Sequence, residues 1–437
     1  MCTFNGILKE YPWISIDSFL QTNCHLSQVF FISHIHTDHL RGLDEPTFAQ
    51  YITNNRSIRI YCSEASRHFL SILPAYKHLS QFYSVVNVDQ PFTIENPMDK
   101  NISITVTCFG SGHCPGSLML LFEGCHGTVL YTGDFRLYSH QSNRHRIISS
   151  KKLIDALYID MTFFEPSIRQ LPEREQACQK LIHFIEQYDY RYFYLKTSAR
   201  VGYEYIYTSL YQHFKILIHV NSEQYHLYDC LPQVQQALTI DGNRTRLHAC
   251  WPQCAHAKSS ITIVLSVLWF TLQQQQQFNS PLIQIATDYY RLCYSLHSSY
   301  TEICKFVKQI SPIRIHPIAL PTHITPERFN GLLKQLGIQQ FPTIYFSPSN
   351  VEQQIKRRYH TIENINSSDN DDELDFDCHQ NRLNNEKQLF KRISNLQQPP
   401  TKKLKTKVDP SMSTTHEQYL NNVDLVVVGP SSPLKSQ

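Results

Sequence analysis

The sequence lacks a hydrophobic run long enough to cross a membrane. Its longest apolar stretch, residues 261–272, covers twelve positions and contains Ser and Thr, whereas a transmembrane helix needs about 20 apolar residues. Residues 1–6 also lack the basic flank and apolar core of a secretory signal. We therefore expect no membrane partner and a protein that stays inside the cell.

The sequence also lacks a strong charge of one sign and a disulfide framework. Its 40 Lys and Arg residues nearly balance 37 Asp and Glu residues, for a net charge of +3, so charge alone selects no partner. The 13 cysteines are odd in number and scattered, unlike those of a small disulfide-stapled domain, and we expect reduced thiols. With 41% hydrophobic residues in 437, the chain can fill one large core or two medium ones.

Residues 1 to about 350 alternate between strand-like and helix-like patterns. Strands are predicted in β-branched or aromatic runs at residues 29–33, 58–62, 102–109, 117–123, 128–135, 156–160, 192–196 and 215–220. Apolar spacing predicts helices over residues 174–187 and 325–336, the second ending at Gly337. The body is therefore predicted to be α/β.

The composition changes from about residue 364 onward. Residues 367–377 are acidic, and residues 402–407 hold four lysines in six positions. Such segments bury too little apolar area to offset chain entropy, so we expect residues 361–437 to form a disordered tail. The lysine run is either a nuclear import signal or a solvated charge cluster.

The strongest chemical signal, Ser-His-Ile-His-Thr-Asp-His, directly follows a predicted strand. It places four potential metal ligands within six residues: His34, His36, Asp38 and His39. Alternate residues share one side of an extended segment, so His34 and His36 can hold one ion while the next two ligands turn toward a neighbouring ion. A lone histidine is usually a satisfied core or surface group, but this spacing indicates a metal site.

Further ligands are expected from distant strand ends. His113 lies in Gly-Ser-Gly-His-Cys-Pro-Gly-Ser and Asp134 in Tyr-Thr-Gly-Asp-Phe, and the glycines allow close backbone approach beside an ion. Asp134 has two carboxylate oxygens and can bridge a pair of cations. Asp17 is suited to a different role, as a carboxylate that orients a ligating histidine.

Taken in order, these three motifs resemble the metallo-β-lactamase fold in its nucleic-acid-processing β-CASP branch. Stretches at residues 10–17, 127–137, 202–205 and 297–300 are similar to the DNA-repair nucleases of that branch. The resemblance covers residues 1 to about 350. It implies a four-layer αβ/βα metallo-β-lactamase catalytic domain at residues 1–155 and 305–350, with a β-CASP domain inserted at residues 156–304.

The resemblance also implies catalytic residues outside the metal motifs. Asp160 matches the first β-CASP motif and His297 the second, and they join Asp38 and Asp17 in the implied catalytic set. The third motif falls at Ala319, where RNA-acting relatives have His and DNA-acting relatives an apolar residue. Ala319 therefore favours DNA.

A second metal site is suggested by two imidazoles and two thiolates, a donor set suited to a structural Zn²⁺. Its predicted ligands are His219, His248, Cys250 and Cys254. Relatives in this branch carry such a zinc in the β-CASP domain. Here the two cysteines are close in sequence, so the fourth ligand is either Cys254 or His256.

Two basic residues precede Gly202 in the predicted β-CASP domain. Lys196 and Arg200 are either nucleic-acid contacts, through phosphate, or solvated surface charges. Their positions do not fall clearly where the family places its lysine.

The activity that the resemblance implies is metal-dependent cleavage of DNA, which opens hairpins and processes overhangs in double-strand-break repair by non-homologous end joining. Zn²⁺ would occupy the main site, with Mg²⁺ or Mn²⁺ possible at the second position, and would activate water for attack on phosphorus. The main alternative is a 5′ exonuclease of DNA interstrand crosslink repair, which shares every ligand. An RNA 3′-end endonuclease, an inactive scaffold and a small-molecule hydrolase explain fewer of the motifs.

The resemblance also suggests a location and partners. Relatives act in the nucleus and use a long C-terminal tail to bind DNA-dependent protein kinase and DNA ligase IV. Only about 75 residues follow the predicted catalytic region here, so these two partners stay open, whereas DNA is expected.

Overall fold

A computed structural model describes residues 2–137, 145–250, 254, 260–267, 270, 280–321 and 324–337. These residues fall within one compact unit, Met1–Ser368. The predicted tail at residues 361–437 lies outside the described residues. Among those that are described, no helix is long and apolar enough to span a bilayer.

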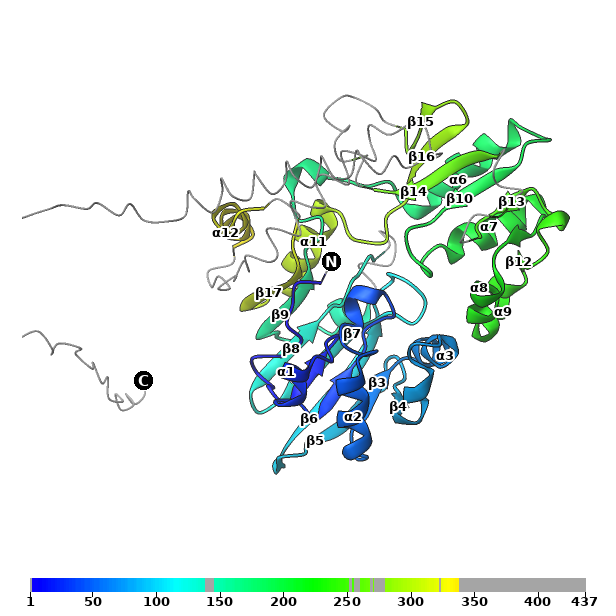
Figure 1. The fold of residues 1–437 in the computed structure, drawn as a ribbon. Coiled ribbons are helices and arrows are strands. Elements are labelled where there is room, and N and C mark those ends of the chain that lie inside the picture. The colour runs from blue at the N-terminus through cyan, green and yellow to red at the C-terminus, as the bar shows by residue number, and fades with distance from the viewer. Residues whose placement is uncertain are drawn as a thin grey trace, which may run out of the picture. The chain divides into compact units, whose positions relative to one another are not determined.

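Two sheets form the region that carries the histidine-rich motif (Figure 1). The first is parallel throughout, in the order β1 (Ile14–Ile16), β2 (Val29–Phe31), β3 (Arg59–Cys62), β4 (Tyr83–Val85). The second has the order β17 (Arg314–Ala319), β9 (Ala156–Asp160), β8 (Gly127–Tyr131), β7 (Leu118–Gly124), β6 (Asp99–Gly110), β5 (Phe92–Asn96). It is antiparallel from β5 to β8 and parallel from β8 to β17.

Strand β2 explains why these sheets stack as layers. Successive side chains of a strand point to opposite faces. Phe30 packs against Phe48 of α2 (Pro46–Asn54), with ring centroids 5.3 Å apart. Its neighbour Phe31 packs against Phe122 of the second sheet, at 5.4 Å. The first sheet therefore has a helical layer on one face and the second sheet on the other.

A second helical layer covers the far face of the six-stranded sheet. Phe306 of α11 (Tyr300–Ile310) packs against Phe135 with ring centroids 4.9 Å apart, and α12 (Pro326–Gln335) joins the same apolar cluster. The resulting order of helix, sheet, sheet and helix confirms the predicted αβ/βα architecture. The remaining elements of this region are α1 (Gln21–Cys24), η1 (Thr37–His39), α3 (Glu64–Ile72), η2 (Lys77–Phe82), α5 (Arg146–Ser149) and η3 (Pro166–Ile168).

A third sheet lies in the chain between β9 and β17, two strands that pair directly with each other. Its order is β12 (Leu238–Thr239), β11 (Ile218–His219), β13 (Leu247–His248), β10 (Phe193–Lys196), β14 (Ile261–Ser266), β16 (Tyr289–Cys293), β15 (Leu282–Ala286), and only the β15–β16 pair is antiparallel. Its helices and turns are α6 (Arg174–Glu186), α7 (Glu204–Phe214), α8 (Ser222–Leu227), η4 (Tyr228–Cys230), α9 (Pro232–Gln235) and η5 (Gly242–Arg244). The third sheet is therefore an insertion into the six-stranded sheet, although β9 itself, inside the range predicted for the insertion, pairs within the six-stranded sheet.

Candidate metal centre

The histidine-rich motif begins where β2 ends, at the carboxyl edge of the first sheet. The 3₁₀ turn η1 (Thr37–His39) bends the chain directly after His36. This bend returns His39 toward His34, so that their ring centroids lie 4.1 Å apart. A short turn after a buried strand thus gathers ligands that are adjacent in sequence.

The loop after β6 brings His113 to the same place. Gly112 in this loop has φ +72°, and a Cβ there would lie 2.5 Å from the carbonyl oxygen of Arg136. Only glycine fits this close backbone approach without a shift. The loop therefore packs directly onto the segment that follows β8, which carries Asp134.

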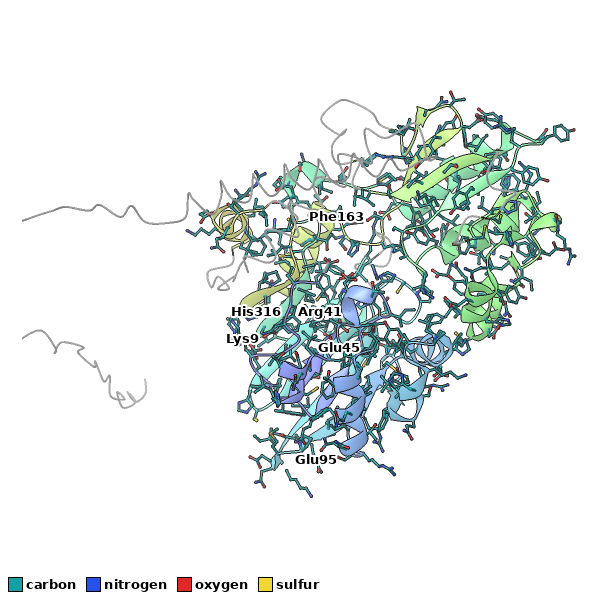
Figure 2. All side chains as sticks on the ribbon, viewed as in Figure 1. Lys9, Arg41, Glu45, Glu95, Phe163 and His316 are labelled. Carbon is teal, nitrogen blue, oxygen red and sulfur yellow. The ribbon has the colours of Figure 1, made fainter. Side chains whose placement is uncertain are left out.

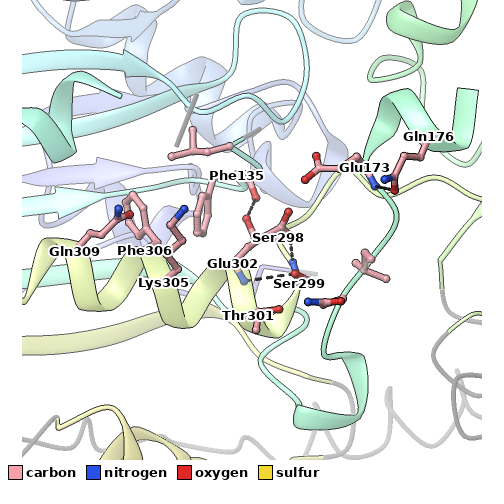
Figure 3. Close-up of a pocket in the computed structure, with 13 residues that line it drawn as sticks. Phe135, Glu173, Gln176, Ser298, Ser299, Thr301, Glu302, Lys305, Phe306 and Gln309 are labelled. Carbon is pink, nitrogen blue, oxygen red and sulfur yellow. Dashed lines mark hydrogen bonds between the residues drawn. The ribbon is translucent and has the colours of Figure 1, made fainter. Parts of the chain in front are cut away.

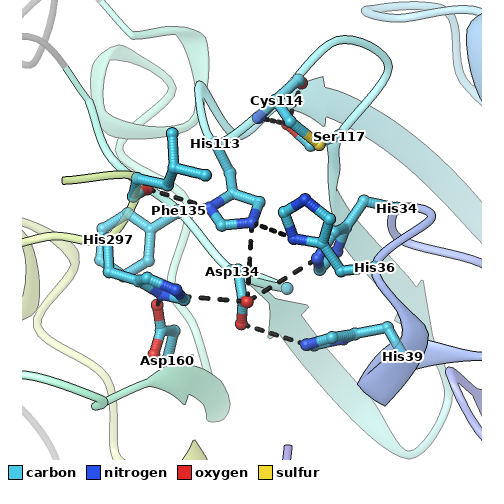
Figure 4. Close-up of polar contacts among 12 residues, drawn as sticks. His34, His36, His39, His113, Cys114, Ser117, Asp134, Phe135, Asp160 and His297 are labelled. Atoms are coloured by element: carbon cyan, nitrogen blue, oxygen red, sulfur yellow. Dashed lines mark hydrogen bonds and ion pairs between the residues drawn. The ribbon is translucent and has the colours of Figure 1, made fainter. Parts of the chain in front are cut away.

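The structure brings together four of the predicted ligands: His34, His36, His113 and Asp134. One potential ligand atom of each lies within 4.8 Å of the others (Figure 4). His113 Nε2 is 2.9 Å from His36 Nδ1. Asp134 Oδ2 is 3.7 Å from both His34 Nε2 and His113 Nε2. Four ligand atoms from three parts of the chain therefore converge on one point.

These residues fit a divalent cation. His34 Nε2 is buried and has no hydrogen-bond partner, which is costly unless an ion satisfies it. Burial lowers the pKa of His34 and of His113 well below the usual value, so both rings are neutral, the form that binds metals. Three imidazoles and a carboxylate form a donor set that Zn²⁺ accepts.

His39 and Asp38 lie on the other side of Asp134. His39 Nε2 is 3.3 Å from Asp134 Oδ1 and 3.9 Å from Asp38 Oδ2. Burial opposes protonation of His39, but the neighbouring Asp134 raises its pKa well above the usual value. Asp134 thus faces two groups of potential ligands, as the sequence predicts for a bridging carboxylate.

Asp17 lies behind His39 and does not face the cluster. Its Oδ2 is 2.8 Å from His39 Nδ1, and it also accepts hydrogen bonds from Ser33 Oγ at 2.6 Å and Tyr131 Oη at 2.8 Å. These contacts fix the His39 ring, the geometry expected of an orienting carboxylate. Sequence reasoning missed Ser33 and Tyr131, since neither residue type indicates a metal site.

His297 and Asp160 lie beside Asp134. His297 Nδ1 is 2.8 Å from Asp160 Oδ2 and 3.8 Å from Asp134 Oδ2. Burial opposes the charge on His297, but Asp160 and Asp134 raise its pKa above the usual value. Phe163, labelled in Figure 2, packs edge-on against the His297 ring at 5.8 Å. The sequence marks His297 and Asp160 separately, and the structure joins them in one hydrogen bond.

The third β-CASP position and the N-terminal segment meet at the same site. Ala319 pairs with Asp160 in parallel register and is buried. Cys2 forms an isolated bridge to Ala319, and its backbone amide donates to Asp38 Oδ2 at 3.0 Å. This contact of residue 2 with Asp38 was not predicted, because a backbone donor leaves no pattern in the side chains of the sequence.

A second cluster lies in the inserted region and contains His219, His248, Cys250 and Cys254 within 4.8 Å. His219 and His248 are register partners on the parallel strands β11 and β13, and their Nδ1 atoms are 3.1 Å apart. Cys254 Sγ is 3.4 Å from His248 Nδ1. Cys254 therefore lies close enough to the other three residues to share an ion with them. The alternative ligand His256 lies outside the described residues.

The two predicted DNA contacts have different surroundings. Lys196 is exposed at the end of β10, whereas Arg200 forms an ion pair with Glu223. The carbonyl of the next residue, Val201, lies 3.1 Å from His36 Nε2. The loop that carries Arg200 therefore touches the metal cluster.

A separate cavity of about 370 Å³ has Phe135 in its wall (Figure 3). None of its lining residues belongs to either metal cluster, so it is distinct from the candidate metal centre. It is lined by Phe135, Leu137, Gln170, Leu171, Glu173, Gln176, Ser298, Ser299, Thr301, Glu302, Lys305, Phe306 and Gln309.

Comparison with known proteins places this geometry in a family. The family described as DNA repair metallo-beta-lactamase matches residues 269–323, and the family described as anti-Pycsar protein Apyc1 matches residues 16–190. The chain therefore has a metallo-β-lactamase fold, and residues 269–323 match the DNA-repair branch of that fold.

Within this branch the chain is similar to the Artemis proteins. It is 34% identical to protein artemis of Danio rerio over 369 residues, which cover 77% of this chain and 56% of that one. The protein artemis of Mus musculus is 30% identical over 408 residues (86% and 56%). The 5′ exonuclease Apollo of Rattus norvegicus is 26% identical over 372 residues (81% and 63%). The chain thus spans about half the length of the Artemis relatives.

Proposed function

We propose that the chain is a metal-dependent DNA endonuclease that opens hairpins and processes overhangs in double-strand-break repair by non-homologous end joining. The observation that carries this proposal is the cluster of His34, His36, His113 and Asp134 with the His297–Asp160 pair beside it. The similarity to the Artemis proteins supports this activity over other hydrolytic uses of the fold.

The donor atoms suggest which ions the site holds. His34, His36, His113 and Asp134 would hold Zn²⁺. Asp38, His39 and the second oxygen of Asp134 would serve a second position, where carboxylates also suit Mg²⁺ or Mn²⁺. Such ions supply Lewis acidity, which activates water at neutral pH and offsets charge on phosphoryl oxygens.

The chain's own residues would complete the chemistry. Asp38, whose side chain is 27% exposed, is placed to position the attacking water or accept its proton. Asp160 holds His297 at Nδ1, which leaves Nε2 to bind a phosphate oxygen or protonate the leaving 3′ oxygen. Ala319 beside Asp160 agrees with DNA as the substrate.

The alternative is a 5′ exonuclease, supported by the similarity to Apollo. An end-labelled DNA hairpin and a 5′-phosphorylated single strand, each tested with Zn²⁺, Mg²⁺ or Mn²⁺, separate the two activities. Internal cuts near the hairpin tip, lost in Asp38→Asn, are expected. Stepwise nucleotide release from the single strand alone would assign the exonuclease activity instead, and full activity of Asp38→Asn would refute the metal mechanism.

The remaining roles complete the proposal. The cluster of His219, His248, Cys250 and Cys254 would hold a structural Zn²⁺, because two thiolates and two imidazoles saturate a tetrahedral ion. Residues 1–155 and 305–350 would form the catalytic domain and residues 156–304 the β-CASP domain, except that β9 (Ala156–Asp160) belongs to the catalytic sheet. We further propose a nuclear location, with DNA-dependent protein kinase and DNA ligase IV as partners. These partners can be tested by measuring kinase and ligase binding to the full chain and to a chain with the tail removed. Binding that is lost with the tail would support them.

A further inference from the structure

One short segment of the inserted region contacts the metal centre twice. Residues 294–297, here called the crossover segment, follow β16 and end at His297. The carbonyl oxygen of Leu296 is 2.9 Å from His113 Nδ1. With His113 Nδ1 donating to this carbonyl, Nε2 is left to face the cluster. The crossover segment thus both supplies His297 and orients a predicted ligand.

Two buried arginines donate hydrogen bonds to the same backbone carbonyl oxygen of the crossover segment. The carbonyl oxygen of Ser295 accepts hydrogen bonds from Arg136 Nη1 at 3.1 Å and from Arg174 Nε at 3.2 Å. Arg136 follows Asp134 by two residues, whereas Arg174 begins α6 in the inserted region. The guanidinium groups therefore join the catalytic sheet and the insertion at one carbonyl.

Arg174 also contacts the backbone of His113 itself. Its Nη2 donates to the His113 carbonyl oxygen at 3.1 Å. Arg174 is only 6% exposed, and its guanidinium carbon lies 5.9 Å from the centre of the Tyr294 ring. The planar guanidinium donates in two fixed directions, which a flexible ammonium group cannot reproduce with the same geometry.

We propose that Arg174 is a positioning residue for the metal centre, because it holds both the backbone of His113 and the segment that orients the His113 ring. Arg136 supports the same segment from the catalytic side. Partners that orient a ligating histidine typically contribute about 10- to 100-fold to metal affinity. The inserted region therefore helps to hold the metal centre in place.

The test compares Arg174→Met with a matched control, Arg246→Met. Arg246 makes the same kinds of contact elsewhere in the insertion, donating to the Tyr188 carbonyl at 2.8 Å with Phe193 as its ring neighbour at 5.6 Å. Zn²⁺-loaded protein is challenged with increasing chelator, and zinc content and the unfolding temperature are measured. Arg174→Met should release one zinc at about 10- to 100-fold lower chelator concentration, and Arg246→Met should release that zinc as the unchanged protein does.

The conservative variant Arg174→Lys covers the case in which Arg174→Met does not fold. It keeps the buried charge, so it should fold, and it should release the same zinc earlier than the unchanged protein. Release at the unchanged concentration by a folded Arg174 variant would overturn the positioning role. The inference rests on the proposed function: an unchanged protein that holds no ion at this centre would overturn both, whereas normal binding without an Arg174 effect overturns only the positioning role.

Discussion

The two clusters of four ligands differ in what surrounds them. Around Asp134, further polar groups stand within reach of the cluster, including His39 at 3.3 Å and His297 at 3.8 Å. Around Cys250, the described hydrophobic contacts place the buried ring of Tyr194 in the same small cluster. A catalytic metal site needs ligands and acid–base groups beyond those that saturate one ion. A structural site needs only a complete set of ligands for its ion. The surroundings therefore separate the two roles better than the number of ligands does.

Removal of His36 should have the largest effect on activity. His36→Ala deletes a ligand of the candidate centre, and partners of such ligands alone contribute about 10- to 100-fold. Cleavage of a labelled DNA hairpin should therefore fall by more than about 100-fold, with little change in the unfolding temperature. Retention of cleavage by this variant would show that the cluster is not the catalytic centre.

Substitution of Cys250 should lower the stability of the protein more than its activity. Burial and the neighbouring Cys254 raise the pKa of the Cys250 thiol to about 11, so a bound cation is needed to keep it as a thiolate near neutral pH. Structural zinc contributes folding free energy, and we expect Cys250→Ser to lose about 2 kcal/mol or more, roughly 5 °C in unfolding temperature. Calorimetry with zinc analysis measures this loss.

The activity of Cys250→Ser, compared with that of His36→Ala, serves as the control for this prediction. At a temperature where Cys250→Ser is still folded, its hairpin cleavage per folded molecule should stay within a few-fold of the unchanged protein. A loss of activity as large as that of His36→Ala, without a loss of stability, would show that the two clusters do not differ in role.

The predicted ligands could be singled out from the sequence because they are chemically rare and stand at strand ends. The run at residues 156–160 is found unchanged as β9 (Ala156–Asp160). By contrast, β17 (Arg314–Ala319) was not predicted, because Pro317 interrupts its pattern, and proline is tolerated there since the strand lies at the edge of its sheet. Local sequence patterns thus predict helices and strands whose residues favour that structure. They miss strands that form because of their pairing in the folded protein.

The supporting contacts of the site could not be predicted. Arg174 reaches the carbonyl oxygens of Ser295 and His113, which are 121 and 61 positions away in the chain. Every residue has a backbone carbonyl, so the pattern of side chains in the sequence does not indicate which carbonyls accept such hydrogen bonds. The sequence can therefore propose candidate ligands, but it does not indicate which residues hold those ligands in place.

Asp160 should tune the pH range of cleavage. Because Asp160 helps raise the pKa of His297, the charged ring is present below that pKa and is lost as pH rises through it. Asp160→Asn keeps the shape but removes the charge, so the alkaline fall of kcat should begin at lower pH, with about a 10-fold loss near neutrality. An alkaline limb that stays in place would mean that protonated His297 is not required.

The smallest effect is expected at the proposed DNA contacts. Each phosphate contact contributes about 0.7 to 0.9 to the slope of log affinity against log salt. Lys196 is exposed, whereas Arg200 already pairs with Glu223. Lys196→Ala should therefore lower the salt slope of DNA binding by nearly one, and Arg200→Ala by less. Binding titrations of catalytically inactive Asp38→Asn protein from low to high salt measure both slopes. Equal slopes for Lys196→Ala and the parent would show that Lys196 is only a solvated surface charge.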